Sequence, residues 1–123
     1  MTTALIIEDN EDNRISMTII LESGGYTVTE AETGESGYQK ALEDKPDFIL
    51  LDIQLPDIDG TEVLRRLRSN EVTRDIPVIA STSYAMSGDR QRLLDAGCDG
   101  YLEKPIDPFR VLSQIELILR GDS

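Results

Sequence analysis

The sequence predicts a doubly wound α/β domain, in which helices cover both faces of a five-stranded parallel sheet. Short apolar runs alternate five times along the chain with segments of helical spacing. This alternation is typical of βαβ units, which build parallel sheets. Because the crossovers of such units are right-handed, we expect helices on both faces of the sheet. A chain of 123 residues fits one domain of this kind.

Five short segments are the strand candidates. The runs ALII and FILL are continuously apolar, as expected for strands that are covered on both faces. The segment TVTEA alternates and is less apolar, which indicates an edge position in the sheet. In chain order the candidates are Ala4–Glu8, Thr27–Ala31, Phe48–Asp52, Pro77–Ser81 and Gly100–Glu103.

The segments between these strands carry helix signals. Asp107 before Pro108 predicts the start of the last helix, because Asp caps a helix and Pro suits its first position. Gly24, Gly25 and Gly97 stand where helices are expected to stop. The predicted helices lie near 13–23, 34–45, 60–70, 88–96 and 108–119.

The composition excludes several classes of function. The chain has 24 acidic and 12 basic side chains, a formal net charge of −12, which argues against binding to nucleic acid. It has no histidine, so histidine-based catalysis, histidine-ligated metal and a phosphohistidine carrier are excluded. A single cysteine, Cys98, cannot form an internal disulfide, and we interpret it as a small buried residue in a reducing compartment. With no apolar run of membrane-spanning length, we expect a cytoplasmic domain that does not contact a membrane.

Polar residues follow four of the predicted strands. Glu8 and Asp9 end the first strand, Asp52 the third, Thr82 the fourth and Lys104 the fifth. Ligands of doubly wound folds bind at this carboxyl edge of the sheet, so we expect these side chains to lie together. Three carboxylates repel one another, and a hard divalent cation with oxygen ligands would offset their charge. Mg²⁺ fits such a small, shallow cluster better than Ca²⁺.

This set of groups suits phosphoryl chemistry. A carboxylate beside a cation, a lysine and a hydroxyl can act as a nucleophile and form an aspartyl phosphate at Asp52. The cation and Lys104 would neutralise charge on the phosphoryl oxygens in the transition state.

These residues carry a resemblance to a known family. Glu8-Asp9, Asp52 in LLDIQLPDIDG, Thr82 and Lys104-Pro105 resemble the receiver domain of two-component response regulators. The match spans essentially the whole chain, and four separate strand ends agree in identity and order. The resemblance implies the flavodoxin-like fold, with strand order 2-1-3-4-5.

The resemblance also implies a role for each matching acidic residue. Asp52 is expected to accept the phosphoryl group. Asp9, Asp52 and the backbone carbonyl of Gln54 are expected to bind Mg²⁺, with Glu8 acting mostly through water. Gly60 matches the turn that follows the acceptor loop.

Further residues match the switch of this family. The resemblance implies that Thr82 moves its hydroxyl onto the phosphoryl group, that Lys104 pairs with that group, and that Tyr101 then turns inward. The peptide bond between Lys104 and Pro105 is expected to be cis. In the family, the surface of the fourth helix, fifth strand and fifth helix binds targets or forms homodimers.

The first predicted helix has a second apolar face. Ile15 and Ile19 lie one turn apart, nearly opposite the arc expected to pack on the sheet, and exposed apolar pairs often mark contact surfaces. We hypothesise that they dock the helical histidine-phosphotransfer domain of the partner kinase. The donor of the phosphoryl group is expected to be a sensor histidine kinase or a histidine phosphotransfer protein. The arc expected to pack on the sheet holds Asn13, Met17, Ile20, Leu21 and Gly24.

The sequence therefore predicts a stand-alone receiver of the chemotaxis or cell-division type, without an output domain. It is expected to be a signalling switch rather than an enzyme, apart from its own phosphoryl transfer and hydrolysis. One alternative is a degenerate receiver that binds partners without phosphorylation. Another is a phosphatase of the haloacid-dehalogenase type, which is disfavoured because Gln54 replaces the second Asp of its D-x-D pair.

Overall fold

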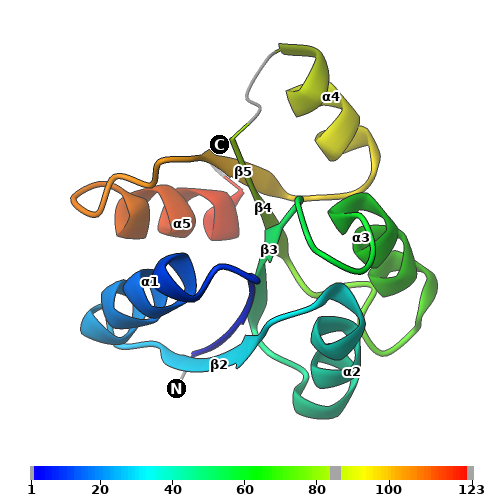
Figure 1. Cartoon of the computed structure of the whole chain (residues 1–123), viewed down its shortest axis with the longest axis horizontal. Helices are drawn as coiled ribbons and strands as arrows, with labels where there is room; N and C mark the ends of the chain where they lie inside the picture. The colour runs from blue at the N-terminus through cyan, green and yellow to red at the C-terminus, as the bar shows by residue number, and fades with distance from the viewer. Residues whose placement is uncertain (1, 84–86, 122–123) are drawn as a thin grey trace.

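The computed structural model describes residues 2–83 and 87–121, with side chains for all of these except 87–90. Strands and helices alternate through these ranges (Figure 1). The strands are β1 (Thr3–Ile7), β2 (Thr27–Ala31), β3 (Phe48–Asp52), β4 (Val78–Thr82) and β5 (Gly100–Glu103). The helices are α1 (Glu11–Ser23), α2 (Gly34–Asp44), α3 (Gly60–Ser69), α4 (Ser87–Asp95) and α5 (Val111–Arg120). None of the described helices is both long and apolar enough to cross a membrane.

The five strands form one parallel sheet in the order β2-β1-β3-β4-β5, so the predicted fold class and strand order are confirmed. TVTEA forms the edge strand β2, as its weaker apolar pattern predicts. Helices α1 and α5 cover one face of the sheet, and α2, α3 and α4 cover the other (Figure 1). The chain direction across the sheet reverses between β1 and β3, the position at which doubly wound folds bind ligands.

Two apolar cores lie on the two faces of the sheet. Successive residues of β1 and β3 alternate between them: Leu5 and Leu51 pack toward α2 and α3, whereas Ile6 and Leu50 pack toward α1 and α5. All four side chains are 4 % exposed or less. A strand buried on both faces has no room for alternating polar residues, which explains the unbroken apolar runs of the sequence.

The glycines predicted to end helices do so. Gly24 is the C-cap of α1, and Gly97, the second residue after α4, adopts a φ of +110°. Its N–H donates to the carbonyl of Leu94, and the next N–H, of Cys98, donates to that of Leu93. This is the Schellman pattern, which favours glycine at the left-handed position. Cys98 is buried there, as predicted, and burial raises the pKa of its thiol.

The starts of two helices differ from the prediction. Helix α1 begins at Glu11, because the Asn10 side chain accepts from the N–H of Asn13 and caps it. Helix α5 begins at Val111, after a turn over 108–110. Asp107 caps that turn: its carboxylate accepts from the N–H of Phe109, and its carbonyl accepts from Val111. The Asp-Pro pair therefore starts the turn that leads into the helix, rather than the helix itself.

Candidate functional site

The residues that follow the strands lie at one edge of the sheet. Glu8 and Asp9 come directly after β1, Asp52 is the last residue of β3, and Lys104 follows β5. Nζ of Lys104 is 2.9 Å from Oε1 of Glu8 and 3.2 Å from Oδ1 of Asp52. Thr82 ends β4, where it is buried and pairs in register with Glu103. The sheet order thus brings together groups that are far apart in the sequence.

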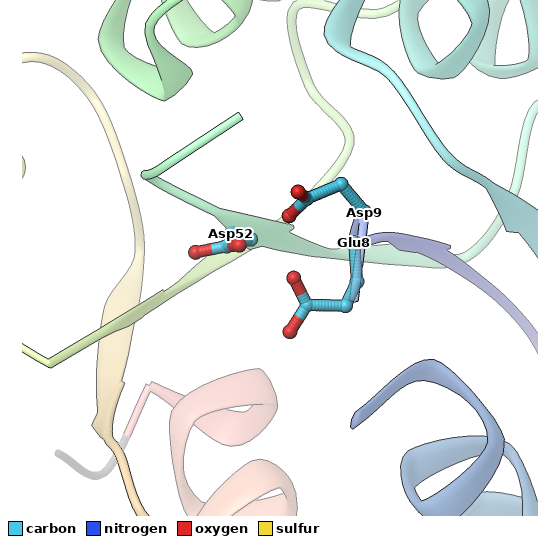
Figure 2. A group of neighbouring side chains, drawn as sticks. All are labelled: Glu8, Asp9 and Asp52. Carbon is cyan, nitrogen blue, oxygen red and sulfur yellow. The ribbon is translucent and has the colours of Figure 1, made fainter. Parts of the chain in front are cut away.

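Three carboxylates form a compact cluster at this edge. One carboxylate oxygen each of Glu8, Asp9 and Asp52 lies within 4.8 Å of the others. Figure 2 shows Glu8 and Asp9 leaving the end of β1 on different sides, with both carboxylates directed toward the side on which Asp52 lies. Glu8 and Asp52 are buried, whereas Asp9 is exposed. The cluster is therefore open to solvent on the side of Asp9.

The charges in this cluster are strongly coupled. Burial and the contact with Glu8 raise the pKa of Asp52 to about 7, against the opposing effects of the Gln54 N–H and Lys104. Burial raises the pKa of Glu8, but its contacts with Asp52 and Lys104 outweigh burial and hold it below its ordinary value. Although burial lowers the pKa of Lys104, the two carboxylates hold it above its ordinary value. A single lysine thus faces two buried carboxylates, and one negative charge is left without a partner once Asp52 loses its proton.

The donor set fits a hard divalent cation. Among the described residues, Oε2 of Glu8 is the buried side-chain oxygen without a hydrogen-bond partner. An unpaired buried carboxylate oxygen is costly, and a cation or its bound water would satisfy it. Mg²⁺ takes oxygen ligands and binds one or two carboxylates while keeping several waters. Asp9 and Asp52 could hold it directly, with Glu8 acting through water.

The loop after β3 brings Gln54 beside the acidic cluster. The Gln54 N–H donates to Oδ1 of Asp52 over 3.1 Å. The loop then folds back, and the N–H of Gly60 donates to the carbonyl of Ile53 over 2.9 Å. A Cβ on Gly60 would lie 2.6 Å from the Cα of Ile53, so only glycine fits this close approach. Gln54 is therefore held next to the carboxylate with which the resemblance pairs it.

Sequence reasoning missed a buried cation at the site, Arg14 of α1. Its Nη1 donates to the carbonyl of Glu8 (3.1 Å) and, more weakly, to that of Asp9 (3.5 Å), while Nη2 lies 3.4 Å from Oε1 of Glu32. The guanidinium thus holds the turn that carries two of the acidic residues. Asn13, which we expected on the packed arc, is exposed instead. The usable signal was the spacing, because Arg14 stands three residues before the buried Met17, on the same helical stripe.

Ile15 and Ile19 are exposed on α1, 47 % and 62 % respectively, so their predicted outward orientation is confirmed. Ile19 also lines a cavity of about 500 Å³ between α1 and the loop after β5. Its walls are mostly apolar, and its polar side holds Asp52, Ser81 and Lys104. The exposed apolar face of α1 therefore continues into a cavity that reaches the acidic cluster.

The two remaining sequence matches lie on β5 and after it. The peptide bond between Lys104 and Pro105 is cis, as the resemblance implies. Tyr101 is half-buried and packs against the core beneath α2, α3 and α4, the face opposite α1. It therefore lies on the face of the sheet that α4 covers.

A 2-1-3-4-5 parallel sheet with this acidic edge belongs to the CheY-like, flavodoxin-like class of folds. The chain belongs to the response regulator receiver domain family, whose family model matches residues 4–116. It is 40 % identical over 121 residues to the polar-differentiation response regulator DivK of Brucella ovis, an alignment that covers 98 % of each chain.

Solved structures agree with this assignment. A response regulator from Chloroflexus aurantiacus, described as putative, superposes with a TM-score of 0.90 at 28 % identity, over 97 % of this chain and 98 % of that one. The receiver domain of the sensor histidine kinase PA1611 from Pseudomonas aeruginosa has a TM-score of 0.88 at 34 % identity, over the same shares of the two chains. That structure has a magnesium ion coordinated in its active-site cleft.

Proposed function

We propose that this receiver accepts a phosphoryl group on Asp52 in a Mg²⁺-dependent reaction and signals through phosphorylation-dependent contacts with other proteins. The observation that carries the proposal is the environment of Asp52, a buried carboxylate beside Lys104, Glu8 and Asp9. Membership of the receiver family supports it, since receivers work with histidine kinases or phosphotransfer proteins and with downstream targets. The chain is then a signalling switch, and its chemistry is limited to its own phosphoryl group.

The residues at the site divide the chemistry between them. A carboxylate oxygen of Asp52 attacks phosphorus while the bond to the donor histidine nitrogen breaks, and the imidazole leaves with that electron pair. Bound Mg²⁺, held by Asp9, Asp52 and the Gln54 carbonyl, would neutralise charge on the phosphoryl oxygens. Lys104, already 3.2 Å from Asp52, is placed to pair with the same oxygens.

The output of the switch is proposed to run through Thr82 and Tyr101. The new phosphoryl group adds negative charge and strong acceptors at the end of β3, and the Thr82 hydroxyl would donate to it. That movement would release space for Tyr101 and bias the surface of α4, β5 and α5 between two states. A downstream protein, or a second copy of the chain, would bind this surface.

The proposed docking face for the phosphoryl donor is α1, through Ile15 and Ile19 next to the cavity at the acidic cluster. Changing both residues to Asp is expected to slow phosphoryl transfer from a purified histidine kinase about tenfold, because a buried apolar contact is replaced by charge. Phosphorylation by acetyl phosphate, which needs no docking, should be unchanged.

Val72→Asp is the matched control for this prediction. Val72 is also 47 % exposed, but it lies in the loop before β4, at the opposite end of the sheet. Equal rates of phosphoryl transfer to the Val72 variant and to the Ile15/Ile19 double variant would contradict docking of the phosphoryl donor on α1.

The proposed function is tested by intact-mass measurement after incubation with acetyl phosphate. We expect the wild-type chain to gain the mass of one phosphoryl group in the presence of Mg²⁺, no gain with EDTA, and no gain in Asp52→Asn. Release of inorganic phosphate is measured in the same samples, because rapid hydrolysis would hide the adduct. If neither an adduct nor phosphate release is detected, with acetyl phosphate or with a kinase as donor, that result contradicts the proposal and favours a degenerate receiver.

A further inference from the structure

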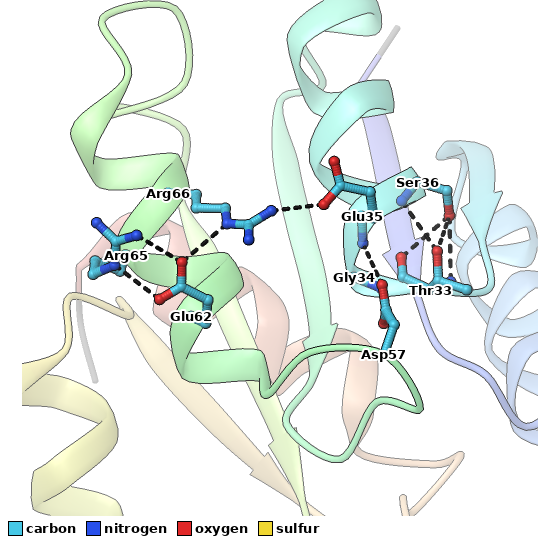
Figure 3. A network of polar contacts seen from close by, with 8 residues as sticks. All are labelled: Thr33, Gly34, Glu35, Ser36, Asp57, Glu62, Arg65 and Arg66. Carbon is cyan, nitrogen blue, oxygen red and sulfur yellow. Dashed lines mark hydrogen bonds and ion pairs between the residues drawn. The ribbon is translucent and has the colours of Figure 1, made fainter.

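Asp57, in the loop between β3 and α3, binds the first turn of α2. Its Oδ1 accepts from the N–H of Gly34 and its Oδ2 from the N–H of Glu35, each over 2.9 Å (Figure 3). These amides have no carbonyl partner within the helix, and the positive end of the helix dipole favours a carboxylate there. The two N–H donors hold the pKa of Asp57 below its ordinary range.

Side-chain packing brings the same two segments together independently. A Cβ on Gly34 would lie 2.6 Å from Cγ1 of Ile58 and 2.8 Å from Cγ2 of Val63. The residue after Asp57 therefore packs against α2 at a position where any side chain would have to displace Ile58 and Val63. Two hydrogen bonds and an apolar contact join the loop to this helix end.

The first turn of α2 is also tied to α3, the helix that ends the loop. Glu35 lies 2.6 Å from Nη1 of Arg66, and Nε of Arg66 lies 2.9 Å from Oε2 of Glu62 (Figure 3). These partly exposed pairs are individually weak. Together with Asp57 they hold α2, the loop and α3 as one connected unit.

The other end of the same loop belongs to the acidic cluster. Gln54 donates its N–H to Asp52, and Ile53 donates its N–H to the carbonyl of Ser81 in the neighbouring strand β4. Only Leu55 and Pro56 separate Gln54 from Asp57. Because the φ of Pro56 is fixed, this short connection has little conformational freedom. A change in the position of Asp57 is therefore transmitted to Gln54.

We propose that Asp57 is a positioning residue for the Mg²⁺ site: it couples the loop carrying Asp52 and Gln54 to the first turn of α2. This inference rests on the proposed function, because it concerns the cation that the function requires. Cation binding orders the end of the loop at Gln54, and the contact of Asp57 with α2 orders its other end. Mg²⁺ binding and the Asp57 contact therefore stabilise each other. By linkage the coupling is reciprocal, and bound Mg²⁺ must strengthen the contact between Asp57 and α2.

The first test compares the Mg²⁺ dissociation constants of four chains by amide NMR titration. Asp57→Ala is expected to raise the constant about fivefold relative to wild type. Thr33→Ala should leave it unchanged, although Thr33 caps the same end of α2 by accepting from the N–H of Ser36. The Thr33 variant thus weakens the helix start without touching the loop.

Asp57→Asn separates the contact from simple loss of charge. Its amide carbonyl can still accept one N–H from α2, so the contact account expects an intermediate Mg²⁺ constant. If charge alone acted, the Asn and Ala variants would weaken Mg²⁺ binding equally, and that result would overturn the proposal. An equal effect of Asp57→Ala and Thr33→Ala would overturn it as well.

The second test is hydrogen exchange at the amides of Gly34 and Glu35, a readout independent of phosphorylation. Saturating Mg²⁺ is expected to slow their exchange in wild type by the same factor, about fivefold, and to have no effect in Asp57→Ala. Exchange that does not respond to Mg²⁺ in a wild-type chain that binds Mg²⁺ would contradict the coupling alone. A wild-type chain that binds no Mg²⁺ would contradict the proposed function and the coupling together.

Discussion

Changing Lys104 to Met is expected to destabilise the metal-free protein by about 3 kcal/mol at pH 7.5, because two buried carboxylates lose their cation. Lys104 lies within 3.2 Å of both Glu8 and Asp52, and the side chains of these two residues are 8 % and 5 % exposed. The methionine fills a similar volume, so the loss is electrostatic rather than a packing defect. Urea unfolding in EDTA measures it.

The same variant is expected to slow phosphorylation by acetyl phosphate at least about 100-fold, because a charge on the transferring group loses a preorganised partner. Adding Mg²⁺ should recover part of the stability, since the cation neutralises the same carboxylates, but not the rate. Lys45→Met removes the same charge from an exposed position after α2 and should change stability by less than about 0.5 kcal/mol. A Lys104 variant as stable and as fast as the Lys45 variant would refute this role.

The second large effect is an increase in stability on changing Asp52 to Asn. In the metal-free fold the pKa of Asp52 is raised to about 7 from an ordinary 3.8, so the folded state holds its proton more tightly than the unfolded chain. The stability that this proton contributes is fully present below pH 4 and is lost as the pH rises to about 7. Asparagine does not ionise and loses no stability in this way, so the stability of Asp52→Asn relative to wild type increases over this pH range.

The unfolding free energy of Asp52→Asn minus that of wild type, both measured in EDTA, should increase by about 2 kcal/mol from pH 5.5 to pH 8.5. Working above pH 5.5 avoids the isoelectric point near 4.2. Glu43→Gln, an exposed change of the same charge on α2, is the matched control. Mg²⁺ should stabilise wild type most at high pH and Asp52→Asn hardly at all. A difference that does not change with pH would mean that Asp52 is not held protonated.

The fold was predictable because its determinants are local patterns. FILLD and ALII are apolar on both faces, TVTEA is not, and glycines mark the helix ends. The site was largely predictable for a topological reason: in a parallel sheet, residues that end strands must meet at one edge. Glu8, Asp52 and Lys104 meet there although Lys104 lies 96 residues after Glu8 in the sequence.

What escaped prediction depends on loops rather than on periodicity. The contact of Arg14 with the carbonyls of Glu8 and Asp9 requires the path of the turn after β1, which the residue pattern does not specify. The contact of Asp57 with Gly34 and Glu35 similarly requires the relative position of two loops. The start of α5 was misplaced because an Asp-Pro pair caps an isolated turn as readily as a helix.

The central claim, that Asp52 is the phosphoacceptor, is tested most directly by mapping the acyl phosphate. The chain is incubated with acetyl phosphate and Mg²⁺, reduced with borohydride, which converts an aspartyl phosphate to homoserine, and digested for peptide mass spectrometry. We predict homoserine at position 52 only, and none when EDTA replaces Mg²⁺. Reduction at Asp9, or at another carboxylate with Asp52 intact, would contradict the account.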